Sequence, residues 1–178
     1  MENFRRIEAA HQRFVAQLGA QAQGIADDYL LIRNISMKTS ARNHFAGTVT
    51  RVVHGAVNDE VEIEVRPGLH IVATVTHESA EGLGLAVGAQ AYALVKASSI
   101  VVVTEVDGAR FSARNQFTGP VARIVAGAVN DEVVIDVVDG VSIAAIITHA
   151  SREELGLAVG GTATAIFKAS SVIVGTPA

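Results

Sequence analysis

A block of 65 residues that occurs twice in tandem limits what this chain can fold into. Residues 40–104 align with residues 112–176 without a gap, and about 39 of the 65 pairs are identical, far more than shared composition produces. Each copy is therefore predicted to be one folding unit. The segments that recur in register are 40–43, 55–60, 76–77, 83–88 and 96–99, matched by 112–115, 127–132, 148–149, 155–160 and 168–171.

The small size of each unit indicates that the units depend on contacts outside themselves. A repeat of this length buries little surface alone, so we expect the two copies to pack on each other or on further subunits. Apolar residues make up 49% of the chain but aromatic residues only 4%. The core must therefore be built from Val, Ile, Leu and Ala, a composition that favours short strands with tightly packed β-branched side chains.

Apolar and polar residues alternate along most of the first repeat, which predicts strands with one buried face. A single helical turn is expected over 79–83, before the fourth strand, and 107–108 are expected to turn between the repeats. Five short strands with one helical turn predict a mainly β chain of two small closed barrels of the oligonucleotide-binding type. The expected strands are 47–53, 61–65, 69–76, 91–96 and 100–104, copied in the second repeat from Gly119 to Thr176.

An N-terminal extension precedes the repeats. Apolar residues spaced by three and four over 2–18 predict an amphipathic helix, which either pairs with a second subunit or packs on its own β-domain. The predicted organisation is a helix and linker over 1–36, a first domain over 37–106 and a second over 107–178.

Charge and composition exclude several classes of function. The net charge of −4 supplies no basic surface for nucleic acid, and no stretch approaches the roughly 20 apolar residues of a membrane span. The N-terminus lacks the apolar run of a signal peptide, so the chain is expected to be soluble and cytoplasmic. Because it has no cysteine, an inorganic ligand would have to be bound by oxygen and nitrogen atoms.

One set of polar residues recurs in both repeats while many positions between them differ. All its members can donate hydrogen bonds, two in each repeat carry positive charge, and none is a carboxylate, which suits a small tetrahedral oxyanion. Free backbone N–H groups at the start of each helical turn are expected to add to this preference. The set is Ser40, Arg42, Thr76, Ser79 and Lys96, with Ser112, Arg114, Thr148, Ser151 and Lys168.

Several of these motifs resemble the molybdenum-binding Mop domain. The resemblance rests on Ser-Ala-Arg-Asn, the Gly-Ala-Val-Asn-x-Glu-Val segment, Leu-Gly-Leu and the Lys-Ala-Ser-Ser ending, in order and in both copies. It covers about residues 38–178 and implies a five-stranded barrel in each repeat. It also implies that molybdate or tungstate binds between units, often from different subunits, with no organic cofactor. The implied ligand-binding residues are Ser40, Arg42, Thr76, Ser79, Lys96 and Ala97, and Ser112, Arg114, Thr148, Ser151, Lys168 and Ala169.

Two kinds of Mop protein remain open from the sequence. A tandem pair resembles the stand-alone cytoplasmic molybdate-binding proteins, which implies storage or buffering without catalysis. It also resembles the effector half of the molybdate-responsive transcription regulator, whose winged helix-turn-helix domain has no counterpart here. Met1 favours the stand-alone form. We expect a homo-oligomer, a dimer if the N-terminal helix pairs and a trimer if the tandem units close a ring, with no direct binding to nucleic acid or membrane.

The histidines and the paired carboxylates raise two alternative hypotheses, a transition-metal site and acid–base catalysis. Only His77 of the first repeat is matched, by His149, and no spacing typical of a zinc site is evident, so no site for a free cation is expected. His77 and His149 are expected beside the oxyanion site or packed on the barrel. Residues 59–60 and 131–132 repeat a carboxylate pair that could suggest acid and base catalysis, but we expect them in a solvated turn.

Overall fold

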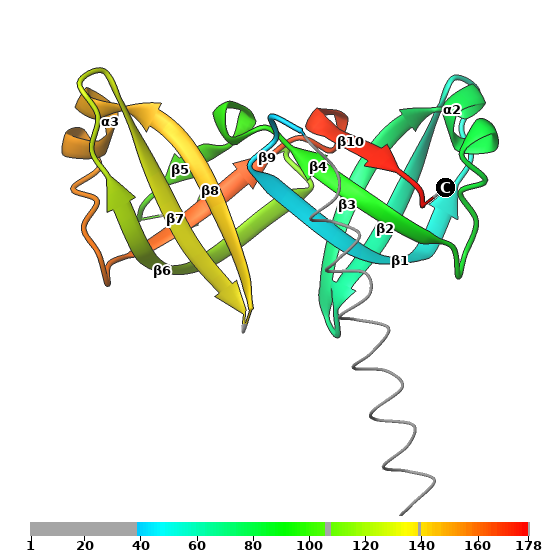
Figure 1. The fold of residues 1–178 in the computed structure, drawn as a ribbon, viewed down its shortest axis with the longest axis horizontal. Coiled ribbons are helices and arrows are strands. Elements are labelled where there is room, and N and C mark those ends of the chain that lie inside the picture. The colour runs from blue at the N-terminus through cyan, green and yellow to red at the C-terminus, as the bar shows by residue number, and fades with distance from the viewer. Residues whose placement is uncertain (1–38, 106–107, 139, 178) are drawn as a thin grey trace, which may run out of the picture. The chain divides into compact units, whose positions relative to one another are not determined.

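The computed structural model describes residues 39–105, 108–138 and 140–177, and these residues form a mainly β fold (Figure 1). The predicted N-terminal helix over 2–18, and the linker that follows it up to 36, lie outside the described residues. Asp107 of the predicted connecting turn also lies outside them, while Gly108 has a φ of 77°.

Each repeat contributes five strands and one short helix before the fourth strand, as predicted. In the first repeat these elements are β1 (Asn43–Val53), β2 (Asn58–Arg66), β3 (Leu69–Thr76), α2 (His77–Gly82), β4 (Gln90–Val95), the 3-10 turn η1 (Ala97–Ser99) and β5 (Val101–Val103). In the second they are β6 (Asn115–Val125), β7 (Asn130–Val138), β8 (Val141–Thr148), α3 (His149–Glu154), β9 (Thr162–Phe167), η2 (Ala169–Ser171) and β10 (Val172–Gly175).

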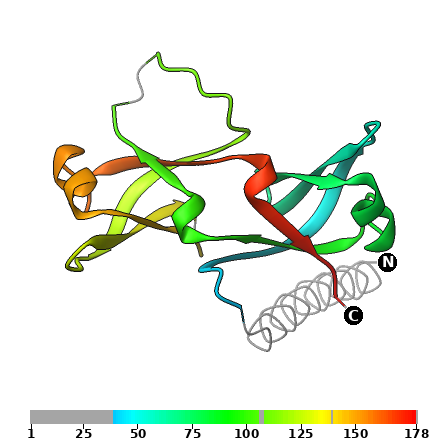
Figure 2. The same ribbon diagram turned by 90° about the horizontal axis from the view of Figure 1, so that it is seen from above.

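The fifth strand of each repeat joins the sheet of the other repeat. The two five-stranded sheets have the orders β10-β4-β1-β2-β3 and β5-β9-β6-β7-β8. Val172 of β10 pairs with Val95 of β4, and Val101 of β5 pairs with Ile166 of β9, both antiparallel. Figure 2 shows the C-terminal strand crossing to the first sheet. The two sheets therefore share backbone hydrogen bonds and cannot separate without breaking them.

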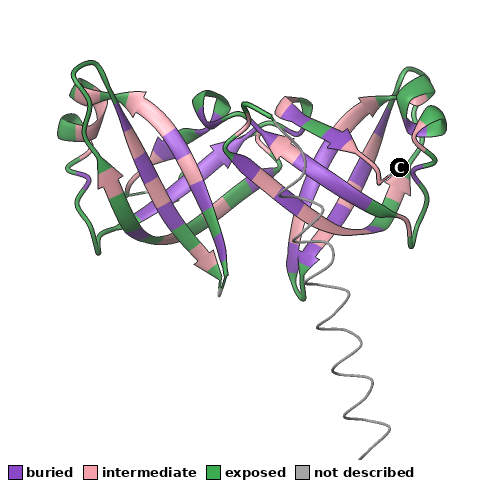
Figure 3. Ribbon diagram, viewed as in Figure 1, coloured by how far each residue is buried: buried purple, intermediate pink, exposed green. Residues whose placement is uncertain are grey.

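The strands β2 and β7 bury β-branched residues at every second position, so the core there follows the alternation in the sequence (Figure 3). Residues at equivalent positions of the two repeats are almost fully buried: Val49, Val61, Ile63 and Ile71 in one, and Val121, Val133, Ile135 and Ile143 in the other.

The strands β1 and β2 approach each other closely at Gly47, and β6 and β7 do so at Gly119. A Cβ atom at Gly47 would overlap with the carbonyl oxygen of Glu64, and one at Gly119 would overlap with that of Asp136. Both contacts lie beside a register shift in the pairing of these strands, where the sheet bends. Glycine is therefore required at these positions for lack of space.

The structure also contains no helix, among the residues it describes, that is both long and apolar enough to cross a membrane.

Candidate functional site

Two of the predicted donors in each repeat form the cap of the short helix. The Thr76 hydroxyl oxygen accepts a hydrogen bond from the backbone N–H of Ser79 at 3.1 Å, and the two hydroxyl groups lie 2.7 Å apart. Thr148 and Ser151 repeat this arrangement with the same distances. The prediction of free N–H groups here is thus wrong for Ser79 and Ser151, because the threonine caps occupy them.

The predicted arginines contact carboxylates of the opposite repeat. The Arg42 guanidinium lies 3.2 Å from the Glu132 carboxylate, and Arg114 lies 2.7 Å from Glu60. Both arginine side chains are more than half exposed. An oxyanion that binds to either guanidinium would therefore have to share it with a carboxylate or displace that carboxylate.

The predicted lysines lie at the entrance to the 3-10 turns. Lys96 and Lys168 precede η1 and η2 and are exposed, and none of the salt bridges among residues 39–105, 108–138 and 140–177 involves either lysine. Ala97 and Ala169 follow them and are buried. Because an alanine side chain has no polar atom, these residues could offer a ligand only backbone groups. The turn η1 packs against β8, and η2 packs against β3.

The strand register divides the donors of one repeat into two groups. Asn43 pairs with Val95, which brings Arg42 and Ser40 near Lys96 at the start of β1. Thr76 pairs with Asn58, next to the end of β1, so Thr76 and Ser79 are separated from Lys96 by the length of that strand. An extended strand of 11 residues spans roughly 35 Å, somewhat less where it curls. One repeat alone does not bring its predicted donors together.

Asn43 and Asn115 are buried polar residues that were not among the predicted site residues. The Asn43 side chain donates to the carbonyl of Ala144 at 2.9 Å and accepts from the N–H of Ala144 at 2.7 Å. Asn115 makes the equivalent pair of bonds with Val72, both at 2.8 Å. The alternation in the sequence could have identified Asn43 as buried, because it shares the inward face of β1 with Phe45 and Val49. These asparagines join the two sheets beside Arg42 and Arg114.

The predicted solvated position of Asp59 and Asp131 is wrong. Both aspartates are fully buried, and they lie in β2 and β7, not in a turn. The reason is the alternation itself, because Asp59 is in phase with the inward-facing Val61 and Ile63. Each carboxylate is compensated by hydrogen bonds, since an unpaired buried charge would be costly.

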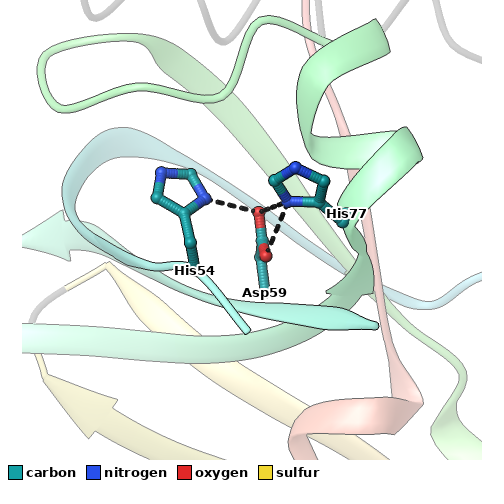
Figure 4. A group of neighbouring side chains, drawn as sticks. All are labelled: His54, Asp59 and His77. Carbon is teal, nitrogen blue, oxygen red and sulfur yellow. Dashed lines mark hydrogen bonds and ion pairs between the residues drawn. The ribbon is translucent and has the colours of Figure 1, made fainter. Parts of the chain in front are cut away.

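In the first repeat the partners of the buried carboxylate are two histidines. The Nδ1 atoms of His54 and His77 lie 2.8 and 3.0 Å from Oδ2 of Asp59, and the backbone N–H of Gly55 donates to Oδ1 at 3.2 Å (Figure 4). Burial acts to raise the pKa of Asp59, but the hydrogen bonds from His54, His77 and Gly55 outweigh it and lower the pKa below its ordinary value. The hydrogen bond to Asp59 in turn raises the pKa of His77.

In the second repeat an arginine takes the place of one histidine. His149 lies 3.0 Å from Oδ2 of Asp131, and Nε of Arg152 lies 2.5 Å from the same oxygen. The backbone N–H of Gly127 donates to Oδ1 at 2.9 Å. That bond lowers the pKa of Asp131; burial opposes the shift, and the contacts with His149 and Arg152 add to it.

Comparison with known proteins follows the same division into repeats. The TOBE domain family matches two segments of the chain, residues 39–102 and 112–174. The chain belongs to the TOBE domain family. The prediction of a tandem Mop or TOBE domain protein is confirmed by these two matches, and the prediction of two five-stranded units is confirmed by the sheets described above.

Named relatives of this TOBE domain chain include a molybdenum-pterin-binding protein and a molybdenum transport protein. The molybdenum-pterin-binding protein MopA of Rhodobacter capsulatus is 46% identical over 144 residues, which are 81% of this chain and 54% of MopA. The molybdenum transport protein ModE of Herbaspirillum seropedicae is 45% identical over 144 residues, again 81% of this chain and 54% of ModE. The chain thus spans about half the length of these curated relatives.

A solved structure matches the tandem TOBE domains over its whole length. The cytoplasmic molybdate-binding protein ModG, crystallised with molybdate bound, is 47% identical to this chain, with a TM-score of 0.77. The match covers 79% of this chain and 100% of ModG.

Proposed function

We propose that the chain binds molybdate, and tungstate by the same chemistry, as a cytoplasmic protein that stores or buffers the oxyanion in molybdenum homeostasis. The observation that carries the proposal is the duplicated set of hydroxyl and cationic donors in a tandem TOBE domain chain. Support comes from ModG, a molybdate-binding protein with 47% identity to this chain.

The chemistry of the donors accounts for a preference among anions. A site that consists of N–H and O–H donors favours a fully deprotonated dianion and penalises hydrogen phosphate, whose proton would face another donor. Sulfate is equally deprotonated, so its exclusion depends on the size of the site. The proposed ligand-binding residues are Ser40, Arg42, Thr76, Ser79, Lys96 and Ala97, with Ser112, Arg114, Thr148, Ser151, Lys168 and Ala169.

The division of these donors into two groups supports an oligomer. Because β1 separates Lys96 from Thr76 and Ser79, one repeat supplies at most part of the donor set. We infer that sites form between units, either across the repeats of one chain or between chains of a homodimer or homotrimer. The function is binding without catalysis, with no organic cofactor, nucleic acid or membrane as partner.

The similarity to ModE supports a second candidate function. The chain could serve as a molybdate-sensing effector module whose shape changes when the oxyanion binds. A storage protein requires many sites and no change of shape, whereas a sensor requires a shape that depends on the anion. Hydrogen exchange with and without molybdate separates the two, because only the sensor should change protection far from the bound anion.

Native mass spectrometry of the chain with and without molybdate tests the proposal. We expect a dimer or trimer that gains at least one molybdate per chain, and tungstate should compete for the same sites. Sulfate at equal concentration provides the control. A monomer that takes up no molybdate would contradict both the binding function and the oligomer.

A further inference from the structure

We propose that His54, Asp59 and His77 form a binding site for one divalent transition-metal ion, such as Zn²⁺, in the first repeat. Each residue offers one ligand atom, and the three atoms lie within 4.8 Å of one another. The two imidazole rings approach the carboxylate from different sides, with their centroids 5.6 Å apart and their planes at 86° (Figure 4). This cluster is separate from the predicted oxyanion donors, although His77 directly follows Thr76.

The donor set has the chemistry of a transition-metal site. Two imidazole nitrogens and one carboxylate oxygen bind Zn²⁺ at about 2.0–2.2 Å. Around such an ion, neighbouring ligand atoms are roughly 3.3 Å apart in tetrahedral geometry. The observed separations of 2.8 and 3.0 Å between each Nδ1 atom and Oδ2 of Asp59 are close to that value, and all three ligand atoms lie within 4.8 Å of one another, so the exposed histidine side chains have to adjust around the ion rather than move to it from elsewhere.

The surroundings of the cluster also fit a bound ion. Asp59 is fully buried and fixed by the Gly55 N–H, whereas the His54 side chain is 64% exposed and the His77 side chain 43%. A metal ion could therefore enter from solvent, with water as a fourth ligand. Nε2 of His77 lies 3.4 Å from Glu81, and metal-binding histidines commonly donate their second N–H to a carboxylate.

The second repeat shows why the site belongs to the first alone. Around the buried aspartate the two repeats differ at two positions. The first repeat has His54 and Ala80 there, and the second has Ala126 and Arg152. The Arg152 guanidinium contacts Asp131 and provides a permanent positive charge. Among the described residues, the salt bridges to Asp59 come only from His54 and His77. The buried Asp59 carboxylate therefore depends on a protonated histidine or a bound cation for its countercharge.

Titration of Zn²⁺ into the full-length, untagged chain tests the proposal. After treatment with a chelator, and without molybdate, the wild-type chain should bind one Zn²⁺ per chain by isothermal titration calorimetry. His54→Ala should weaken binding by at least about tenfold, the loss caused even by removing a residue that only orients a ligand. Because the His54 side chain is largely exposed, this variant should keep its fold, which circular dichroism verifies.

His70→Ala is the matched control, since His70 lies between Glu62 and Glu64 on the outer face of the same sheet. It should leave Zn²⁺ binding unchanged.

The double variant Ala126→His with Arg152→Ala should create a second site and raise the stoichiometry from one to two. Co²⁺ provides a second measurement, because its visible absorption reports nitrogen and oxygen ligation and should disappear in His54→Ala. Unchanged Zn²⁺ affinity in His54→Ala, or no Zn²⁺ uptake by the wild-type chain, would overturn the proposal.

Discussion

The side chain of Asn43 binds both backbone groups of Ala144, a residue 101 positions away in the other repeat. Asn115 binds both backbone groups of Val72 in the same way. Each asparagine side chain thus makes the pair of hydrogen bonds that a neighbouring strand would make, and so connects the two sheets. Together with the exchange of β5 and β10, these bonds make the two repeats one cooperative unit.

The first prediction concerns this bridge. Asn43→Ala leaves the partly buried N–H and C=O of Ala144 without their partner, and an unpaired polar group that is fully buried costs about 1–3 kcal/mol. We expect the free energy of unfolding to fall by about 1 kcal/mol or more, measured by denaturant titration. Asn115→Ala should have at least as large an effect, because the N–H and C=O of Val72 that it leaves unpaired are buried.

Gln116→Ala is the control for these two variants. Gln116 follows Asn115 directly, but its amide is exposed and bonds only to the nearby carbonyl of Ala113. Its replacement should change stability by no more than about 0.5 kcal/mol. Equal stability of Asn43→Ala and Gln116→Ala would show that the bridge contributes nothing.

The second prediction concerns the close approach at Gly119. A methyl group there would overlap with the backbone oxygen of Asp136, so β6 or β7 must shift. We expect Gly119→Ala to destabilise the chain by about 1–3 kcal/mol, as overpacking does. Gly82→Ala is the matched control, since a Cβ atom at Gly82 would meet nothing within 4 Å. Thermal unfolding of both variants compares them, and a harmless Gly119→Ala would contradict the steric argument.

The third prediction concerns Asp131 and acid. Its pKa in the folded chain is lowered, so its ionised form adds stability above the unfolded value of about 3.9. That contribution is lost as pH falls through the folded pKa. Asp131→Asn should therefore be less stable than wild type at neutral pH, and the difference should shrink below about pH 4.

Unfolding by denaturant at several pH values measures this difference. Asp136→Asn is the control, because Asp136 lies on the exposed face of the same strand. Its stability should stay close to that of wild type. A stability gap between wild type and Asp131→Asn that persists unchanged into acid would refute the assigned role of the ionised carboxylate.

The strands could be predicted from the sequence wherever apolar and polar residues alternate. Alternation from Val61 to Val65 predicted β2, and its extension back by two residues would have identified Asp59 as buried. The same alternation places Asn43 on the inward face of β1, with Phe45 and Val49. For Asp59 the polar character suggested solvent, although burial with full hydrogen bonding was equally compatible with the pattern.

The exchange of the fifth strands could not be predicted from the sequence. Val101–Val103 and Val172–Gly175 are equivalent, Val-rich segments of two similar repeats, so either could pair with β4 or β9 on propensity alone. In the structure, η1 and η2 lie between the fourth strand of each repeat and the fifth strand that joins the other sheet. The His54–Asp59–His77 cluster was missed for a similar reason, because the three residues come from a loop, a strand and the start of a helix.

The fourth prediction concerns the lysines of the proposed oxyanion sites. Lys96 and Lys168 occupy equivalent exposed positions before η1 and η2, and neither takes part in the salt bridges of the described residues. Each is therefore available to an anion, in contrast to Arg42 and Arg114, which contact carboxylates. Since both repeats keep the full donor set, the lysines should serve two classes of site.

Lys96→Ala and Lys168→Ala should each abolish or weaken one class of molybdate site and leave the other intact. Removal of a charged group from a buried ion contact costs roughly 2–5 kcal/mol. That corresponds to a loss of about 30-fold or more in affinity, measured by titration calorimetry. Arg66→Ala is the control, because Arg66 is exposed at the end of β2 and its counterpart in the second repeat is Val138. If both lysine variants keep the number and affinity of their sites, the repeated donors do not bind the oxyanion, and their recurrence reflects the architecture of the repeats.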